Sequence, residues 1–368
     1  MKAETQPCAI ARMSVDEMVR NLGDAYSRLL CNKAPLVSMP SIMLWSAPGL
    51  GKSQGVRQLA RYIADRTGKK SAITDVRLLL FNPVDLRGIP VANEQRTLAV
   101  WLRPKIFDMD HDEGVLNFLF LDEISAAPPS VQAAAYQITL DRVIGEHALP
   151  DNCIVIAAGN RVTDKSVAYH MPLALANRLC HIEIECDMIS WRRWAVANAI
   201  HEKIIAYLAW RPDRLTTFDA TNDSLAFPTP RTWEMASHLL SCVSDDLDTV
   251  YPLLCGCIGT GAAVEFRSFC RLYAHMPSMD EIFAGRCRKT PQEPDALYAL
   301  LSAMTAHARA HKDDMIAIGH SIRYAMSMPP DFTFMLFRDY MALENGYQKK
   351  ILHIPAFADW LQRNQSLL

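Results

Sequence analysis

The sequence predicts an α/β domain with a parallel sheet, followed by a mainly helical second half. Short, continuous apolar runs recur through the first ~190 residues, and ten or so residues separate each pair, which is enough for a crossover. A glycine-rich loop lies between the first of these runs and a helical pattern. From Ser190 onward the strand signals largely vanish, and helical periodicity dominates.

Capping signals and apolar runs predict the individual elements. Ser14 and Glu17 have the spacing of a capping box and precede a helical pattern, so we expect a helix over residues 14–31. A second helix is expected from Ser53 to Arg66. Continuous apolar runs are typical of strands covered on both faces. They predict strands at Ile42–Trp45, Val76–Phe81, Leu116–Leu121, Cys153–Ala158 and His181–Ile184.

These patterns divide the chain into three parts. We expect an α/β domain over residues 1–190, a helical domain over 191–275 and a helical extension over 276–368, with Pro and Asp clusters near the second boundary. Residues 85–104 contain two short extended pieces around a polar turn, which predicts an inserted β-hairpin.

The loop Ser46–Ser53, SAPGLGKS, ends as a phosphate-binding P-loop does. Glycines let the backbone curl so that amide groups point at phosphate oxygens, and the helix that follows adds its positive end. Lys52 would reach the outer phosphates of ATP, and the Ser53 hydroxyl would bind Mg²⁺. Ser46 stands where the pattern has its first glycine, and the alternative is an ordinary strand-to-helix turn. The residues expected to contact ATP here are Pro48, Gly49, Leu50, Gly51, Lys52, Ser53 and Gln54.

A second motif, FLFLDE, is an apolar strand that ends in two carboxylates. Asp122 would hold Mg²⁺ through water, and Glu123 would act as general base toward the attacking water. The alternative is that both acids cap the next helix. A base for water favours hydrolysis of ATP over phosphoryl transfer to a small acceptor, which must exclude water.

The order of motifs resembles the AAA+ superfamily, and more narrowly the MoxR-like ATPases, over roughly residues 40–240. The resemblance implies a P-loop NTPase core of the AAA+ type, a helical lid over 191–275 and a further helical extension. The blocks that carry it, besides the P-loop, are NPVDLRGIPV from Asn82, LDEISAAPPSVQAAAYQ from Leu121, IVIAAGNRVTD from Ile154, LANRLCHIEI from Leu175 and FPTPRTW from Phe227.

The resemblance also implies roles for single residues. Asn160 looks like the sensor 1 residue that orients the lytic water, although a strand-end Asn is also common in turns. Arg178 looks like an arginine finger that acts on the neighbouring subunit's ATP, and the alternative is a surface arginine at a helix end. Arg231 resembles the sensor 2 cation of the lid, which would touch the γ-phosphate. Lesser candidates are Arg161 for the sensor, Arg192 and Arg193 for the finger, and Asn82 for holding Glu123 in an inactive pose.

The function implied is Mg²⁺-dependent ATP hydrolysis by a ring, hexameric by resemblance, that remodels a partner protein as a chaperone does. MoxR-like proteins imply a partner with a von Willebrand A domain, and the hairpin at 85–104 is the expected contact, with Leu98 and Trp101 as its working residues or its core. Two alternatives remain: a DNA-directed AAA+ motor or loader, and a module that binds ATP as a switch with little turnover.

Composition limits the remaining possibilities. Lys and Arg number 38 against 40 Asp and Glu, so nucleic acid is an unlikely partner on charge. No apolar run has the length of a signal peptide or a membrane span, and we expect a cytoplasmic protein. The ten cysteines form no C-x-x-C pair. His307 and His311 lie one helical turn apart, but two ligands do not make a metal site.

Overall fold

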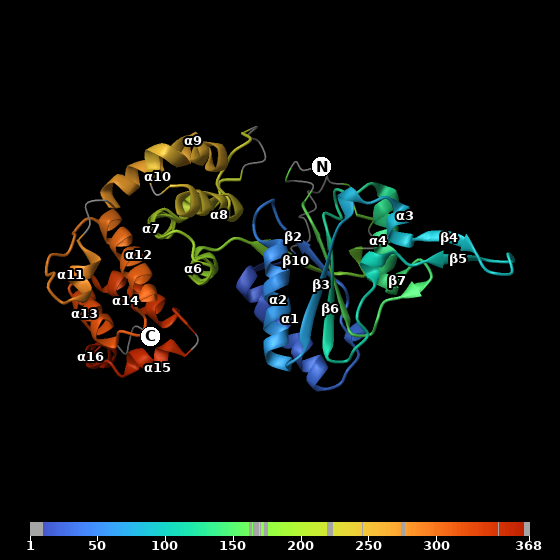
Figure 1. Ribbon diagram of the computed structural model, residues 1–368, viewed down its shortest axis with the longest axis horizontal. Helices are drawn as coiled ribbons and strands as arrows, with labels where there is room; N and C mark the ends of the chain where they lie inside the picture. Colours follow the sequence, from blue (N-terminus) through green and yellow to red (C-terminus); the bar gives the residue numbers. More distant parts are fainter. Residues whose placement is uncertain are drawn as a thin grey trace, which may run out of the picture. The chain divides into compact units, whose positions relative to one another are not determined.

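The computed structural model describes residues 10–161, 164, 169, 171–172, 176–218, 224–244, 246–273, 277–344 and 346–363. These residues cluster into two compact units, one before and one after the boundary between Cys186 and Asp187 (Figure 1). The first unit is α/β and the second is helical. Each unit is described by itself.

The α/β unit is built on a six-stranded sheet in which every neighbouring pair is parallel. The strand order is β1-β10-β2-β9-β6-β3. The predicted fold class, an α/β core on a parallel sheet followed by helices, is therefore confirmed. The strands are β1 (Ala11–Ser14), β2 (Ile42–Trp45), β3 (Lys70–Arg77), β6 (Val115–Asp122), β9 (Cys153–Gly159) and β10 (Cys180–Glu185).

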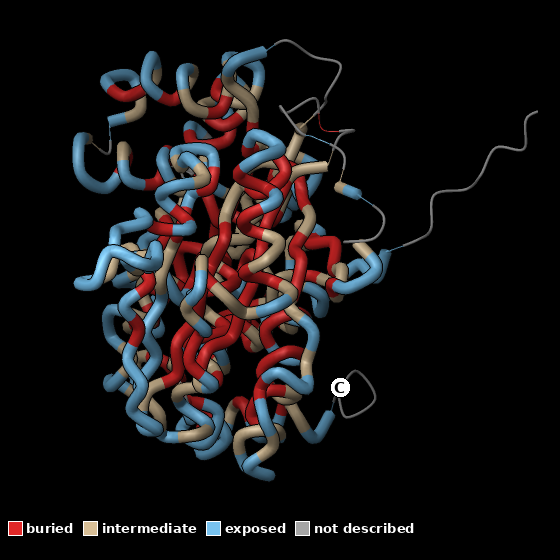
Figure 2. The backbone as a smooth tube through the Cα atoms, turned by 90° about the vertical axis from the view of Figure 1, so that its right-hand side faces the viewer, coloured by how far each residue is buried: buried red, intermediate tan, exposed pale blue. Residues whose placement is uncertain are grey.

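Alternating strand residues supply two separate hydrophobic cores, one on each face of the sheet. On one face, Leu44 of β2 and Phe118 of β6 pack with helices α1 (Val15–Cys31) and α2 (Lys52–Thr67). On the other face, Met43 and Leu119 pack with α4 (Pro129–Asp141). Buried and exposed residues also alternate along the helices, because each helix presents one apolar face to a hydrophobic core (Figure 2).

Helix α1 begins where the capping box predicts. The amide of Ser14 donates to Glu17 Oε2 at 2.9 Å, and the amide of Glu17 donates to Ser14 Oγ at 3.3 Å. The strand β1 just before this helix was not predicted from the sequence. Its four residues, ARMS, include two polar side chains at the edge of the sheet and carry no apolar run.

One predicted strand is wrong in position. The apolar run at Val76–Phe81 predicts a strand, but β3 runs from Lys70 to Arg77, and a 3₁₀ turn, η2 (Leu78–Leu80), follows it. The strand lies at the edge of the sheet and is largely exposed, so polar residues are tolerated along it. Other short 3₁₀ turns are η1 (Leu36–Ser38) and η3 (Lys105–Phe107).

The predicted β-hairpin is present and extends from the α/β unit (Figure 1). After the short helix α3 (Pro83–Arg87), strands β4 (Ile89–Ala92) and β5 (Ala99–Leu102) pair antiparallel. Gly88 begins this hairpin at φ 89°, and a Cβ there would lie 1.9 Å from Leu102 O, so the close approach requires glycine. A second hairpin, β7 (Val143–Ile144) and β8 (His147–Ala148), lies against the first, with His147 Nε2 2.7 Å from Trp101 O.

The helical unit contains both of the helical parts expected from the sequence. Helix α12 packs on α7 and α10, so residues from the two expected parts share one compact body. Arg192 of α6 forms a buried ion pair with Asp339 of α14. The elements are α6 (Met188–Ala197), α7 (Glu202–Trp210), η5 (Pro212–Arg214), α8 (Pro230–His238), η6 (Leu239–Val243), α9 (Leu247–Ile258), α10 (Thr260–Tyr273), α11 (Met279–Phe283), α12 (Pro294–Ala310), α13 (Met315–Ala325), α14 (Pro330–Met341), α15 (Tyr347–Leu352) and α16 (Pro355–Arg363).

Membrane-spanning helices and metal-binding clusters were both sought in the described part of the chain. No helix there is both long enough and apolar enough to cross a membrane. No three His, Cys, Asp or Glu side chains within it group as a metal site would require. The rings of His307 and His311 lie 4.3 Å apart, and the His307 ring also lies 4.3 Å from that of Phe283, so this histidine pair packs on an aromatic ring.

Candidate active site

The candidate site lies where parallel strands end at one edge of the sheet. Strand β9 pairs with β2 on one side and with β6 on the other. Because neighbouring strands are ~4.8 Å apart, the residue after β9 must lie between the loops that follow β2 and β6. The strand order thus brings together Lys52, Asp122 and Asn160, which belong to three separate sequence motifs.

The loop after β2 has the backbone that a phosphate cradle needs. Gly49 and Gly51 adopt φ angles of 80° and 99°, a region that glycine enters without strain. Helix α2 starts directly after Gly51, so its first amide groups have no carbonyl to bond within the helix. Within the described residues, the amides of Gly49, Leu50, Gly51, Ser53 and Gln54 have no hydrogen-bond partner.

The departure at Ser46 has a simple structural account. Ser46 is not among the positive-φ residues, so its position does not require glycine. Its side chain is buried, and its hydroxyl donates to Ala47 O at 2.9 Å. Serine at this position therefore does not distort the loop. Its hydroxyl lies beside the Lys52 ammonium group.

Lys52 is held by oxygen atoms on both sides of the loop. Its Nζ donates to Ser46 O at 2.8 Å, to Ser46 Oγ at 3.0 Å and to Asn160 Oδ1 at 2.7 Å. Like phosphate oxygens, these oxygens accept hydrogen bonds from the ammonium group. The ammonium group is thus directed to the loop and to the end of β9.

Ser53 and Asp122 meet at the start of α2. Ser53 Oγ donates to Asp122 Oδ2 at 3.0 Å, which joins the loop after β2 to the end of β6. The other carboxylate oxygen, Asp122 Oδ1, accepts from the amide of Glu123 at 2.9 Å. Glu123 has φ 59°, uncommon for a residue other than glycine, and within the described residues its carboxylate has no hydrogen-bond partner.

Asn160 is fixed from behind by a residue that the sequence did not single out. Its amide N–H donates to Ser125 Oγ at 2.9 Å, and Ser125 is buried. The neighbouring Gly159 leaves room for this contact, because a Cβ there would lie 2.8 Å from the same oxygen. Ser125 thus positions the backbone of Asn160, and the Asn160 side chain faces Lys52.

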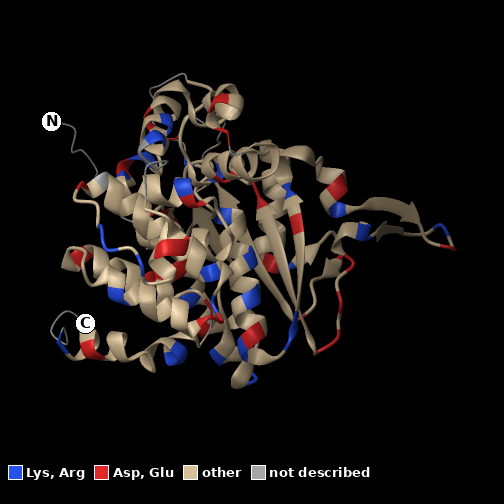
Figure 3. Cartoon of the chain, turned by 60° about the vertical axis from the view of Figure 1, so that its left-hand side comes forward, with Lys and Arg blue, Asp and Glu red and all other residues tan. Residues whose placement is uncertain are grey.

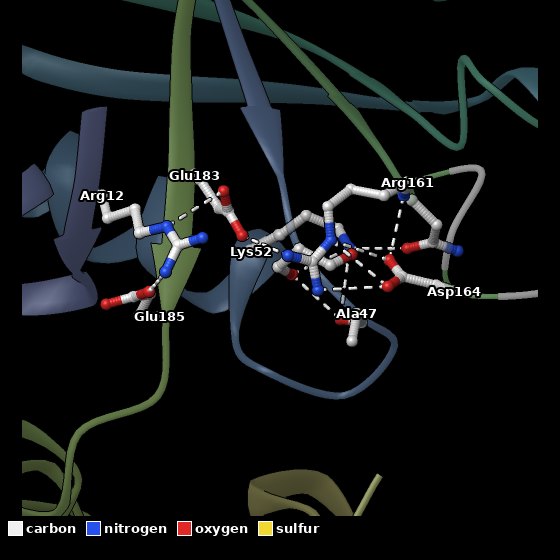
Figure 4. Close-up of polar contacts among 9 residues, drawn as sticks. Arg12, Ala47, Lys52, Arg161, Asp164, Glu183 and Glu185 are labelled. Carbon is white, nitrogen blue, oxygen red and sulfur yellow. Dashed lines mark hydrogen bonds and ion pairs between the residues drawn. The ribbon is translucent and has the colours of Figure 1, made fainter. Parts of the chain in front are cut away.

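Arg161 is engaged in an ion-pair network and does not face the phosphate loop freely. Its backbone amide donates to Asp164 Oδ2 at 2.9 Å, its guanidinium pairs with Asp164 and Glu183, and Arg12 lies 3.5 Å from Glu183 (Figure 4). Burial alone would lower the pKa of Arg161, but the hydrogen bonds and charges of Asp164 and Glu183 raise it. The network ties the segment after β9 to strand β10.

The two candidate cations, Arg178 and Arg231, belong to different units of the structure. Arg178 lies in the turn just before β10, is exposed, and has no ion pair within the described part of the chain. Arg231 is exposed in the first turn of α8, in the helical unit. Their roles toward a neighbour and toward the γ-phosphate stay predictions.

Two lesser candidates, Arg192 and Asn82, lie at positions that differ from those expected. Arg192 is buried against Asp339, so it is removed as a candidate for an arginine finger, whereas Arg193 is exposed. Asn82 is not a strand end: it is the N-cap of α3, and its amide donates to Asp85 Oδ2 at 2.8 Å. Turn chemistry therefore accounts for Asn82.

Sequence reasoning missed Ser125, Asp164 and Glu183. All three lie within the sequence blocks quoted above, but each acts through a contact between segments far apart in the chain or across a turn, which those blocks do not predict. A polar residue predicted within an otherwise apolar strand is the one available signal, and Glu183 of the run HIEI fits it.

The residues present fit a nucleotide with magnesium. Backbone amides at the N-terminus of α2 suit phosphate oxygens, and Lys52 adds a cation beside them. A hydroxyl and a carboxylate 3.0 Å apart supply the oxygen ligands that Mg²⁺ prefers, with most of its other positions filled by water and phosphate.

Comparison with known proteins finds a curated relative at low identity. No family model matches the chain. A chaperone, MoxR1 of Mycobacterium tuberculosis, is 26% identical over 147 residues, which are 39% of this chain and 35% of that protein. The predicted resemblance to MoxR-like AAA+ ATPases is confirmed. The match takes in only about a third of the relative's length.

Several solved structures match the chain at low identity and low TM-score. A lysine-to-arginine mutant of RuvB from Thermotoga maritima is 15% identical with a TM-score of 0.37, and covers 80% of this chain and 83% of its own. PCH-2 of C. elegans is 17% identical with a TM-score of 0.35, covering 65% and 62%. A putative ATPase from Cytophaga hutchinsonii is 16% identical with a TM-score of 0.29, covering 88% and 83%. Likenesses of this size say nothing about what this chain does.

Proposed function

We propose that this chain is a Mg²⁺-dependent ATPase that works as a ring and remodels a partner protein. The observation that carries the proposal is the meeting of three strand ends. Lys52 reaches Asn160 at 2.7 Å, and Ser53 reaches Asp122 at 3.0 Å. In this proposal ATP lies on the loop amides, Mg²⁺ is held by Ser53 and by Asp122 through water, and Pro48, Leu50 and Gln54 line the nucleotide.

Each remaining residue has a role in hydrolysis. Glu123, which directly follows Asp122 at the end of β6, accepts a proton from the attacking water. Asn160 orients that water once Lys52 has turned to the phosphates. Arg178 of one subunit stabilises the charge that develops on the phosphoryl group of the next, and Arg231 links the γ-phosphate to the helical unit.

The hairpin β4–β5 is the proposed contact with the client. Its strands carry no charged residue, and charges gather only at its tip (Figure 3). Ile89, Leu98 and Leu102 are 60%, 68% and 56% exposed, so much of their apolar surface faces solvent. Exposed apolar surface of this kind is typical of protein contact sites. A partner with a von Willebrand A domain is the client class that the resemblance implies, and a hexamer is the implied ring.

Steady-state phosphate release with two single variants and their mixture tests the proposal. Glu123→Gln and Arg178→Ala should each bind ATP and lose about 10²-fold or more in turnover. Mixing the two should restore part of the activity, because intact Glu123 and intact Arg178 then meet at shared sites. No release by the wild-type chain would contradict hydrolysis and favour the ATP-dependent switch. Full activity of Arg178→Ala would remove the arginine finger.

The partner class needs a separate experiment. Affinity capture with Glu123→Gln held in ATP should retain a protein, and Leu98→Ser should weaken that capture without changing phosphate release. A gel shift that requires ATP and weakens steeply with salt would instead favour the DNA-directed alternative.

A further inference from the structure

His181 bridges the strand that precedes the P-loop and the turn that carries Arg178. Trp45 is the last residue of β2 and directly precedes Ser46. Strand β10 lies beside β2, and Trp45 pairs in register with Glu183. Since side chains two apart on a strand share a face, His181 lies on the face of the sheet that Trp45 occupies.

Hydrogen-bond chemistry fixes the state of this imidazole. Trp45 Nε1 lies 2.9 Å from His181 Nδ1, and an indole N–H can only donate. His181 Nδ1 must therefore be the acceptor, and the ring proton of the neutral imidazole is on Nε2. Nε2 lies 2.7 Å from Ala176 O, which can only accept, so both ring nitrogens are satisfied at once.

The ring geometry agrees with a directed contact. The two rings are inclined by 15° with centroids 6.0 Å apart. Nearly coplanar rings at that spacing suit a hydrogen bond in the plane of the rings, whereas face-to-face packing would bring the centroids closer.

The carbonyl that His181 binds belongs to the turn around Arg178. The amide of Leu179 donates to the same Ala176 O at 3.2 Å, which closes the turn, and Leu179 is buried. The amide of Cys180 donates to Ser41 O at 3.0 Å, so the residue that starts β10 is also fixed. The backbone around Arg178 is thus anchored while its side chain is exposed.

We propose that His181 is a positioning residue for the cation that one subunit offers to the next. This inference rests on the proposed function, in which Arg178 acts in trans. His181 does not touch the nucleotide. It holds the Arg178 turn against the end of β2, so the strand that leads into a subunit's own P-loop also sets where its Arg178 projects. Each subunit's nucleotide loop and its contribution to the neighbouring site then share one support.

His181→Phe tests this role because the variant keeps a ring and loses both hydrogen bonds. Displacing a catalytic group by about 1 Å costs on the order of 10²-fold in turnover, so we expect that loss in kcat. The dissociation constant for ATP should change less than about twofold, because nothing that contacts the bound nucleotide is altered. Trp45→Phe removes one of the two hydrogen bonds and should lose about two- to tenfold in kcat. His111→Phe, the same substitution in the exposed loop before β6, should leave kcat unchanged.

Mixed rings separate a positioning role from general damage. His181→Phe subunits mixed with Glu123→Gln subunits should regain activity, because the latter supply a well-placed Arg178 to intact sites. Mixed with Arg178→Ala subunits, they should regain none. Restored activity in that second mixture, or weakened ATP binding by His181→Phe, would overturn the inference. If Glu123→Gln and Arg178→Ala fail to complement each other, the arginine finger itself fails, and the two failures are distinguishable.

Discussion

Single residues of the phosphate loop separate what glycine is needed for from what it is not. Gly51 sits at φ 99°, where a side chain is strained, whereas Ser46 does not adopt a positive φ. The sequence pattern treats both positions as glycines, and only the backbone angles tell them apart.

We therefore expect Ser46→Gly to change the affinity for Mg-ATP little and Gly51→Ala to weaken it. Ser46→Gly should keep the affinity for Mg-ATP within about threefold, since it removes one of several acceptors around Lys52. Gly51→Ala should weaken it by about tenfold or more, because strain of about 1–3 kcal/mol falls on the loop that binds phosphate. Fluorescence titration with a labelled nucleotide measures both. Equal losses in the two variants would contradict this account of the loop.

At the residue scale, the motif residues could be predicted and their supports could not. Lys52, Ser53 and Asp122 belong to motifs whose chemistry is readable along the chain, whereas Asn160 was implied by the family resemblance. Ser125 and Glu183 contribute through tertiary contacts, which depend on the strand order rather than on any local spacing.

At the element scale, α1 approaches α2 closely at Gly23. A Cβ on Gly23 would lie 2.3 Å from a ring atom of Tyr62, and that ring is held by a 2.8 Å hydrogen bond from its hydroxyl to Asp24. Gly23→Ala should therefore destabilise the protein by about 1–3 kcal/mol. Gly256→Ala is the matched change in α9, where no atom lies within 4 Å of the added Cβ, and it should stabilise by about 0.5–1 kcal/mol. Urea denaturation of both variants measures the difference, and losses of equal size would contradict the packing argument.

Helices α11 and α12 carry a pH dependence through His307. Burial, and then the charge of His311, lower the pKa of His307, while Asp280 raises it less. A histidine whose pKa is lower in the folded state binds more protons when unfolded, so the protein loses stability as pH falls below ~6.5. The thermal midpoint should drop between pH 7.5 and 5.5, and drop less in His307→Gln. His353→Gln, a change at an exposed histidine, should show the wild-type drop. An equal drop in all three proteins would count against His307.

Elements with strong apolar runs were predictable, and edge elements were not. Strands β2, β6, β9 and β10 lie within the sheet and match the predicted runs closely. The edge strands β1 and β3 include exposed polar residues, so their hydrophobic signal is weak, and the run after Val76 led the prediction of β3 too far along the chain.

At the scale of the whole molecule, the chain joins an α/β unit with the candidate ATP site to a helical unit that carries Arg231. The helical patterns before and after the Pro and Asp clusters lie in the same compact unit, because α12 packs back on α7. The proposed mechanism needs both units, since hydrolysis in one has to move the other.

Titration calorimetry with Mg-ATP on the wild-type chain and on Lys52→Ala tests the central claim most directly. We expect saturable binding at one site per chain, weakened at least about tenfold in Lys52→Ala, a loss of about 1.4 kcal/mol or more. Removing Mg²⁺ with a chelator should weaken wild-type binding, because Ser53 and Asp122 then lack the ion they share with the phosphates. No heat with the wild-type chain, or the same affinity in both proteins, would contradict a nucleotide site at Lys52.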